Sequence, residues 1–185
     1  MADATTPRGR STDHLAAVRV LLIGGGRRGR ALAAGLTSEG HAVRAVTRTQ
    51  AGRAAIEAIG AECWIGDPDR IGTLRYALDN VTVVVWALGT ATGEPEQVRA
   101  LHGSRLTMLL ERTIDTTARG FIYEVAGSVD PRALERGAAE VRRMCELNEV
   151  PYALLRADPA DERAWAAAAR AEIDRLLAAD RRTSR

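Results

Sequence analysis

The sequence predicts an α/β fold built on a doubly wound, mainly parallel six-stranded sheet in a single domain. Short apolar runs alternate with segments of helical spacing along most of the chain, which is the pattern of successive βα units. Residues 81–87 are apolar on both faces, as expected for a central strand covered by helices on both sides. The length of 185 residues suits one compact domain.

Six runs have the character of buried strands, rich in Val, Ile, Leu and Ala. The first ends at three consecutive glycines, and the fourth is the most strongly apolar. Each is short enough for a strand and is bounded by turn residues or by a helical segment. The predicted strands are residues 18–23, 42–46, 61–65, 81–87, 121–125 and 151–156.

Helical segments separate these strands. The first is an Ala-rich stretch that ends at Glu39-Gly40, and the last carries an apolar stripe that begins at Trp165 and lies opposite charged residues. Trp165 either anchors this last helix on the domain or belongs to a homodimer contact. The other predicted helices are residues 51–59, 71–78, 96–117 and 131–148. The expected organisation is a flexible tail (1–16), a domain (17–160), and a C-terminal helix and tail (161–185).

The basic residues are all of one kind. The chain has 26 Lys and Arg residues in total, and every one is Arg. A lysine Schiff base, a P-loop lysine and a Tyr-x-x-x-Lys pair are therefore excluded. The formal net charge is only +2, and no basic block lies on a recognisable binding motif, so no nucleic-acid partner is expected.

The remaining composition indicates a cytoplasmic protein without metal. Cys63 and Cys145 are far apart, in no metal-type spacing, and are expected to be small core residues. No apolar run approaches the ~18 residues that a membrane span needs. The polar N-terminus lacks the hydrophobic core of a signal peptide, so neither a membrane nor a secretory pathway is expected.

A glycine motif follows the first strand. Residues 24–29 read Gly-Gly-Gly-Arg-Arg-Gly and match G-x-G-x-x-G between a strand and a helix. In that context Gly24 permits the tight turn, Gly26 lets the backbone approach a pyrophosphate, and Gly29 lets the helix pack against the strand. The helix N-terminus would then face the phosphates. A glycine-rich turn without a ligand is the alternative interpretation.

The end of the second strand bears on which dinucleotide is bound. An acidic residue usually stands there to bind the ribose hydroxyls of NAD, but this chain has Thr47-Arg48. An Arg at that place suits the 2′-phosphate of NADP, and one or both of Arg27 and Arg28 are expected to reach the same anion site. NADP(H) is therefore predicted over NAD(H). The alternative for Arg48 is a solvated surface side chain.

Two further strand ends complete the predicted site. Asp67 lies where a carboxylate can accept from the adenine amino group, although it can also act as a helix N-cap. Ala87, Leu88 and Gly89 are small or apolar residues that would let the ribose and nicotinamide cross the sheet edge, unless they form a plain strand end. Trp86 either stacks near the cofactor or fills the layer between sheet and helices.

These motifs together resemble the NmrA-like group of atypical short-chain dehydrogenases, which are NAD(P)H-binding Rossmann proteins. The resemblance covers residues 18–157 and includes the glycine turn, residues 43–48, Gly66-Asp67, the 81–87 strand and the 150–156 segment. It implies a Rossmann fold that binds NAD(P)H.

The sequence departs from the catalytic members of that group. The Ser that often ends their fifth strand is replaced by Glu124-Val125, and no Tyr-x-x-x-Lys follows. Tyr123 is the weak catalytic candidate that remains. His102 is expected at the surface or at an interface. The loops 88–95, 126–132 and 157–162 would form a shallow pocket. The polar candidates around that pocket are Glu94, Tyr123, Glu124 and Ser128.

Two functional hypotheses follow from these features. In the first, the protein is an NADP-dependent oxidoreductase that transfers a hydride between nicotinamide and a small acceptor, with the proton supplied by water, substrate or Tyr123. In the second, it is a non-catalytic NADP(H)-responsive regulatory or interaction protein. The resemblance favours the first hypothesis, and the missing Ser and Lys favour the second.

Overall fold

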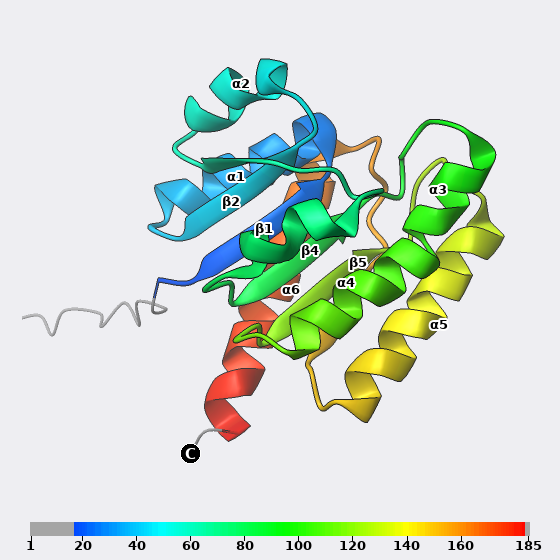
Figure 1. The fold of residues 1–185 in the computed structure, drawn as a ribbon. Coiled ribbons are helices and arrows are strands. Elements are labelled where there is room, and N and C mark those ends of the chain that lie inside the picture. The colour runs from blue at the N-terminus through cyan, green and yellow to red at the C-terminus, as the bar shows by residue number, and fades with distance from the viewer. Residues whose placement is uncertain (1–16, 184–185) are drawn as a thin grey trace, which may run out of the picture.

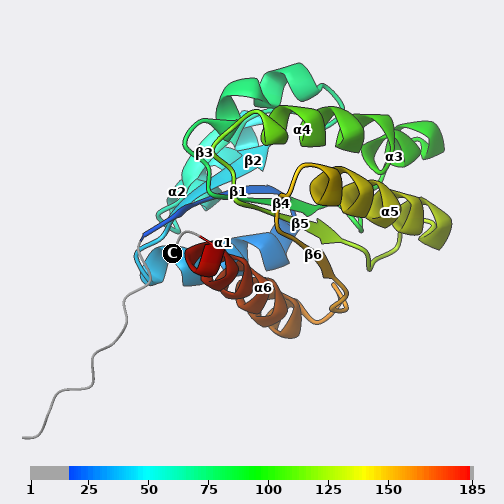
Figure 2. The same ribbon diagram turned by 90° about the horizontal axis from the view of Figure 1, so that it is seen from below.

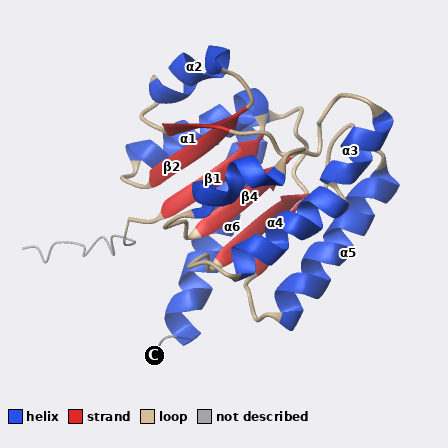
Figure 3. Ribbon diagram, in the orientation of Figure 1, coloured by secondary structure: helices blue, strands red, loops and turns tan. Residues whose placement is uncertain are grey.

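The computed structural model describes residues 17–183 and contains the six-stranded sheet that the sequence predicts. The strand order is β3-β2-β1-β4-β5-β6, and every neighbouring pair is parallel. Figure 3 shows the strands side by side between helices. The strands are β1 (Arg19–Gly24), β2 (Ala42–Thr47), β3 (Glu62–Ile65), β4 (Val83–Ala87), β5 (Gly120–Glu124) and β6 (Tyr152–Leu155). The predicted α/β doubly wound fold is confirmed, and the predicted tail 1–16 lies outside the described residues.

Helices cover both faces of the sheet. Helices α1 and α6 lie on one face, while α4 and α5 lie on the other (Figure 2). Figure 1 follows the chain through them in order. The helical elements are α1 (Gly26–Ser38), η1 (Gln50–Gly52), α2 (Arg53–Glu57), η2 (Ile71–Leu78), α3 (Pro95–Leu101), α4 (Ser104–Ile114), α5 (Pro131–Leu147) and α6 (Glu162–Thr183). No helix among residues 17–183 is both long enough and apolar enough to cross a membrane.

Strand β4 lies in the middle of the sheet and is buried along its whole length. Val83, Val85 and Ala87 pack with the α1 and α6 side, while Val84 and Trp86 pack with the α4 and α5 side. The run is apolar on both faces because both faces meet helices. Trp86 therefore fills the layer between the sheet and the helices and does not reach a binding groove.

The two cysteines have the core environments that the sequence predicts. Cys63 is half-buried and packs against the apolar cluster on the α1 side. Cys145 is buried in the opposite cluster, and burial raises the pKa of its thiol to about 12. A thiol with such a pKa stays protonated at neutral pH, so Cys145 is an inert packing residue.

The predicted helix 51–59 is divided into the 3-10 helix η1 and the five-residue helix α2. Two further predicted helices differ from the structure. Residues 96–117 do not form one helix, because the chain turns at His102-Gly103 between α3 and α4. Residues 71–78 form the 3-10 helix η2 instead of an α-helix. The apolar spacing reports burial correctly for α4 and η2, but it identifies neither the break after α3 nor the helix type of η2.

The last helix behaves as its apolar stripe predicts. Trp165, Ala169, Ile173 and Leu176 are all buried in the cluster that also contains residues of α1, β5 and β6. Helix α6 thus packs across α1 and the edge of the sheet. Trp165 is fully buried, which confirms its predicted role as the residue that anchors α6 to the domain.

Candidate functional site

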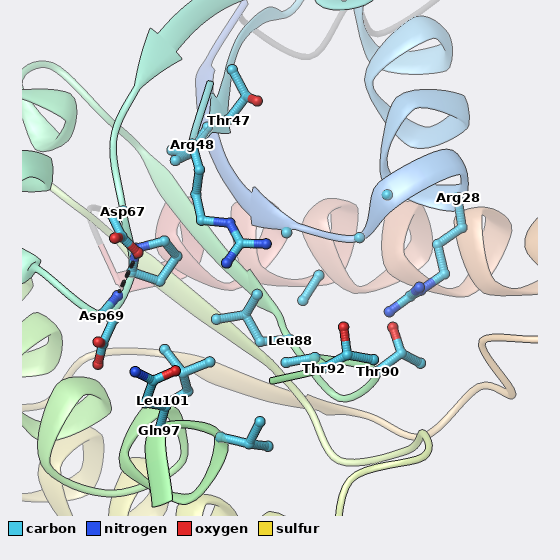
Figure 4. A pocket seen from close by; sticks show the side chains of 18 residues that line it. Arg28, Thr47, Arg48, Asp67, Asp69, Leu88, Thr90, Thr92, Gln97 and Leu101 are labelled. Atoms are coloured by element: carbon cyan, nitrogen blue, oxygen red, sulfur yellow. Dashed lines mark hydrogen bonds between the residues drawn. The ribbon is translucent and has the colours of Figure 1, made fainter. Parts of the chain in front are cut away.

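A groove of about 380 Å³ opens at the carboxyl edge of the sheet. It lies beside the ends of β1 and β4, where the strand order reverses, and ligands of doubly wound folds bind at this switch point. Figure 4 shows the side chains around it. The walls come from the glycine turn, from the ends of β2, β3 and β4, and from the chain between residues 90 and 101.

The glycine turn has the geometry that the motif predicts. Gly24 has a φ of 87°, and a Cβ there would lie 2.5 Å from the carbonyl oxygen of Ala87. A Cβ on Gly29 would lie 2.8 Å from the carbonyl oxygen of Gly24, so α1 packs closely against β1. A Cβ on Gly26 would meet nothing within 4 Å, so the backbone there faces open space. This opening lets a ligand approach the main chain.

The N-terminus of α1 borders the groove. The 13-residue helix begins at Gly26, and no side chain caps its first turn. The amide groups at such a helix end lack partners within the helix and carry the positive end of the dipole. Together with the open approach at Gly26, they suit the pyrophosphate of a dinucleotide.

Arg48 stands directly after β2 and points into the groove (Figure 4). It is exposed, and its guanidinium makes no hydrogen bond or ion pair with any other described residue. Thr47 lies beside it, with its hydroxyl bonded to the carbonyl of Thr49 at 3.3 Å. An unpaired guanidinium in a groove is a ready partner for a phosphate.

Asp67 lines the groove beside Arg48, after the neighbouring strand β3 (Figure 4). Its carboxylate accepts the amide N–H of Asp69 at 3.0 Å and the Nε–H of Arg70 at 3.3 Å. Because η2 begins only at Ile71, Asp67 does not cap that helix, and the N-cap interpretation is wrong. The carboxylate instead holds the turn after β3 at the edge of the groove.

Arg28 differs sharply from Arg48. Its Nη2 donates to both oxygens of the Glu124 carboxylate at 2.8 Å, and its Nε donates to Oε1 at 3.2 Å. Only 7% of Arg28 is exposed. Figure 4 shows Arg28 and Arg48 on opposite sides of the glycine turn. Arg27 is exposed and pairs with Glu162 at 3.2 Å, outside the groove. Of the two Arg residues expected beside Arg48, Arg27 lies outside the groove, and Arg28 lines it with its charge already paired to Glu124.

Glu124 is the centre of a buried polar cluster. The Trp165 indole N–H donates to its Oε1 at 2.7 Å, and the Gly89 amide donates to its Oε2 at 2.6 Å. Burial raises the pKa of Glu124, while the Arg28 charge and the Gly89 hydrogen bond oppose that rise. Gly89 is thus held behind the groove and does not line it, whereas Ala87 and Leu88 do.

The sequence indicates the pairing of Arg28 with Glu124 through the buried positions of both residues. Arg28 stands four and eight residues before Leu32 and Leu36, on the buried stripe of α1. Glu124 alternates with Ile122 on the face of the sheet that α1 covers. Two opposite charges at buried positions of facing elements must pair, since an isolated buried charge is very costly.

The glycine turn, the open helix end and the free Arg48 lie in a part of the chain that is similar to known proteins. The family model described as NAD(P)H-binding matches residues 24–149. The protein belongs to this NAD(P)H-binding family. No curated protein matches the sequence. The matched segment contains the whole glycine turn and the ends of β2, β3 and β4, which together line the groove.

Solved structures share the fold at low sequence identity. UDP-glucose 4-epimerase from Thermotoga maritima, solved with UDP-glucose, is 16% identical with a TM-score of 0.63 over 75% of this chain and 54% of that one. WbmG from Bordetella bronchiseptica, solved with NAD, is 18% identical, with a TM-score of 0.61 over 82% and 55%. Triphenylmethane reductase from a Citrobacter species, solved with NADP(H), is 16% identical, with a TM-score of 0.57 over 75% and 48%. The chain spans about half the length of these structures.

Tyr123 does not line the groove. Its side chain is fully buried on the α4 and α5 side of the sheet, and its hydroxyl lies 2.7 Å from Nδ1 of His102. Burial raises the pKa of Tyr123 above its ordinary range. The catalytic candidate from the sequence therefore occupies a packed interior position, on the face of the sheet opposite Glu124.

His102 is an interior residue, so the prediction that it lies at the surface or an interface is wrong. Only 2% of it is exposed, and its Nε2 lies 3.2 Å from the carbonyl oxygen of Leu88. Burial lowers the pKa of His102 to about 4. The neutral imidazole can donate a hydrogen bond from Nε2–H to the Leu88 carbonyl oxygen. Its Nδ1 can accept a hydrogen bond from the Tyr123 hydroxyl. The turn between α3 and α4 brings this imidazole inward, where it supports the floor of the groove.

A second hollow of about 410 Å³ adjoins the groove and shares Ala91, Thr92 and Val98 with it. Its other wall includes Ser128 and comes from the start of α5. Of the polar candidates expected in a substrate pocket, only Ser128 lines this hollow, and the 157–162 turn contributes nothing to either space.

Several residues of the groove wall lie beyond the predicted cofactor-binding residues. They come from the glycine turn, the end of β2, the loops after β3 and β4, and α3. Those in the loop after β4 belong to the 88–95 segment that was expected in a substrate pocket. In a doubly wound fold the loops after neighbouring strands meet at one edge, which is the signal that would have found them. The missed residues are Gly25, Val46, Pro68, Asp69, Thr90, Ala91, Thr92, Gln97, Val98 and Leu101.

Proposed function

We propose that the protein binds NADP(H) in preference to NAD(H) and acts as an atypical short-chain dehydrogenase of the NmrA-like kind, reducing a small acceptor. The observation that carries the dinucleotide preference is Arg48, an exposed and unpaired guanidinium that points into the groove. A 2′-phosphate gives this side chain a bidentate partner. NAD(H) has no group at that place to neutralise it.

The remaining groove residues fit the other parts of the cofactor. The turn at Gly26 and the N-terminus of α1 suit the pyrophosphate. The Asp67 carboxylate suits the adenine amino group. Ala87 and Leu88 offer an apolar surface for the nicotinamide ribose. When bound, the cofactor supplies the hydride, and this chain's residues hold and orient it.

Proton delivery follows a different route from the Tyr-Lys pair of the catalytic relatives. No Lys occurs anywhere in the chain, and no Tyr, His or Cys lines the described groove. We infer that water or the substrate itself supplies the proton. Triphenylmethane reductase, one of the proteins with this fold, is a reductase solved with NADP(H), and it supports the choice of reduction.

The residues that line the groove also support a second function. The ionisable side chains that line the groove are Arg28, Arg48, Asp67 and Asp69, and Arg28 is neutralised by Glu124. A groove that binds a redox dinucleotide without an acid near the acceptor also suits a non-catalytic NADP(H)-responsive protein. Its output would pass to a partner through the protein surface.

Calorimetric titration with NADPH and NADH tests the dinucleotide preference. The wild-type protein should bind NADPH at least tenfold more tightly than NADH. Arg48→Ala should remove most of that preference by weakening NADPH alone, as expected for the loss of one charge-assisted contact of about 1.5–3 kcal/mol. Arg136→Ala is the matched control, because it removes an equal charge from an exposed position of α5 far from the groove. Equal losses of NADPH and NADH in Arg48→Ala would refute the 2′-phosphate assignment.

Turnover separates the two functions. NADPH oxidation is followed at 340 nm (about the absorbance maximum of the reduced nicotinamide) with quinone and flavin acceptors, the general hydride-acceptor classes for such cofactors. Turnover that saturates with NADPH supports the reductase. Tight NADPH binding without turnover on any acceptor supports the responsive protein.

A further inference from the structure

The cluster around Glu124 joins four parts of the molecule. Arg28 comes from the first turn of α1, Glu124 ends β5, Gly89 follows β4, and Trp165 lies in the first turn of α6. The carboxylate receives the guanidinium of Arg28, the Trp165 indole N–H at 2.7 Å and the Gly89 amide at 2.6 Å. One buried side chain thus holds the glycine turn, two strand ends and the last helix together.

The cluster is more elaborate than packing requires. Buried ion pairs contribute little net stability compared with apolar residues of similar volume, and their best-attested use is to fix a particular arrangement. Here the arrangement concerns Arg28, which is held on two sides. Glu124 binds its Nε and Nη2, and its guanidinium carbon lies 5.0 Å from the centre of the Trp165 ring.

The third side of Arg28 faces the dinucleotide groove. Arg28 lines the groove beside Gly26, and Figure 4 shows its guanidinium directed toward the wall that carries Thr90 and Thr92. Within the described residues, its Nη1 has no hydrogen-bond partner. The same side chain therefore contacts α6 on one side and offers a donor to the groove on the other.

We propose that binding of a ligand in the groove is coupled to the docking of α6 through Glu124 and Trp165. Arg28 is the side chain that contacts both the groove and α6, and Glu124 is the positioning residue that orients it. The proposal rests on the proposed function in one respect, since it takes a dinucleotide as the occupant. Docked α6 holds Arg28 in the orientation that presents Nη1 to the groove, so it favours binding. By reciprocity, a bound dinucleotide stabilises the docking of α6.

Hydrogen exchange of the wild-type protein tests the coupling without any substitution. Saturating NADP⁺ should slow exchange of the amides of residues 165–177 in α6 about fivefold or more, within the usual range of coupling between two sites. Residues 106–114 of α4, on the opposite face of the sheet, are the internal control and should change much less. Equal protection of both helices would report a global gain in stability and would overturn the coupling.

Two buried residues of α6 provide the matched variants. Trp165→Phe retains a large apolar ring but removes the N–H bonded to Glu124 and weakens the contact with Arg28. Ile173→Ala loosens the same face of the helix without touching the cluster. We expect Trp165→Phe to raise the Kd for NADP⁺ about fivefold or more and Ile173→Ala to leave it within about twofold, once both proteins are shown to be folded. Equal effects of the two would overturn the proposal.

Glu124→Gln tests the positioning role directly. The amide retains an oxygen acceptor but loses the charge that orients Arg28, so NADP⁺ and NAD⁺ should both bind more weakly and by similar factors. A loss confined to NADP⁺ would place the effect at Arg48 and overturn the coupling. If neither dinucleotide binds the wild-type protein, the proposed function fails and the coupling fails with it. If NADP⁺ binds and the exchange of α6 is unchanged, the coupling alone fails.

Discussion

The two ends of the groove contain the same kind of cation in opposite states. Near β2, Arg48 is exposed and unpaired among the described residues. Near β5, Arg28 is buried and paired with Glu124 at 2.8 Å. The first end can select a charged ligand, because its charge is not compensated by the protein. The second end is already neutral, so it contributes shape and orientation. In a chain whose cations are all Arg, pairing and burial decide the role of each one.

The largest effect on stability is expected at the end of the groove near β5, where Arg28 is buried. Glu124→Ala leaves Arg28, the Trp165 indole N–H and the Gly89 amide without their shared acceptor, and breaking a buried pair in this way costs about 3–5 kcal/mol. Arg48→Ala changes an exposed side chain and should stay within about 0.5 kcal/mol of wild type. Urea unfolding followed by circular dichroism measures both. A loss below about 1 kcal/mol in Glu124→Ala would contradict the contrast between the two ends.

A double variant separates the buried charge from the buried volume. Arg28→Met combined with Glu124→Leu removes both charges while filling the space with apolar atoms. Such replacements are often close to neutral or stabilising, so most of the stability lost in Glu124→Ala should return. Binding of dinucleotide should not return, because Nη1 of Arg28 is gone.

The next effect concerns acid pH and His102, which supports the groove floor through Leu88. The pKa of His102 is lowered from 6.5 to about 4 by burial. Below pH 6.5 His102 binds a proton in the unfolded chain but stays neutral in the folded protein until about pH 4. Stability from this source is therefore complete above about pH 6.5 and falls by about 3 kcal/mol on going down to pH 4.

Urea midpoints between pH 7 and pH 4 measure this loss. His102→Gln removes the titrating group and should make the decline in this window shallower by that amount. Parallel declines for wild type and variant would show that His102 takes up its proton at the same pH in the folded and unfolded states, so that burial does not lower its pKa.

Local patterns explain how much of this fold and site the sequence could predict. The succession of strands and helices and the roles of Gly24 and Gly29 follow from strand–turn–helix spacing, and Arg48 is found by its distance from the glycines. His102 was misplaced because apolar spacing runs continuously across residues 96–117, while Gly103 lets the chain turn there. The pairing of Arg28 with Glu124 spans 96 residues, and local spacing shows only that each is buried.

A smaller effect is expected at Gly29, between the two ends. A Cβ there would lie 2.8 Å from a backbone oxygen and 3.3 Å from Leu22 Cδ2, so Gly29→Ala must push α1 away from β1 at a cost of about 1–3 kcal/mol. NADPH and NADH should both bind more weakly.

Gly35→Ala is the matched control in the same helix, because a Cβ at Gly35 meets nothing within 4 Å. It should stabilise the protein by about 0.5–1 kcal/mol through helix propensity alone. Thermal unfolding measures both variants. Destabilisation by Gly35→Ala comparable to that by Gly29→Ala would mean that close packing at the turn is not the cause.

The smallest effect is expected at the end of the groove near β2, where Arg48 is exposed, and it is a dependence of dinucleotide preference on salt. Arg48 is exposed, so its attraction to a 2′-phosphate is screened as the Debye length falls from about 10 Å at 0.1 M salt to 3 Å at 1 M. The ratio of NADPH to NADH affinity should therefore shrink by about two- to threefold over that range in the wild-type protein. In Arg48→Ala the ratio should be nearly independent of salt. If the ratio of NADPH to NADH affinity of the wild-type protein does not change with salt, Arg48 binds the phosphate in a closed, desolvated site. The two ends of the groove would then be more alike with ligand bound than they are in the ligand-free protein.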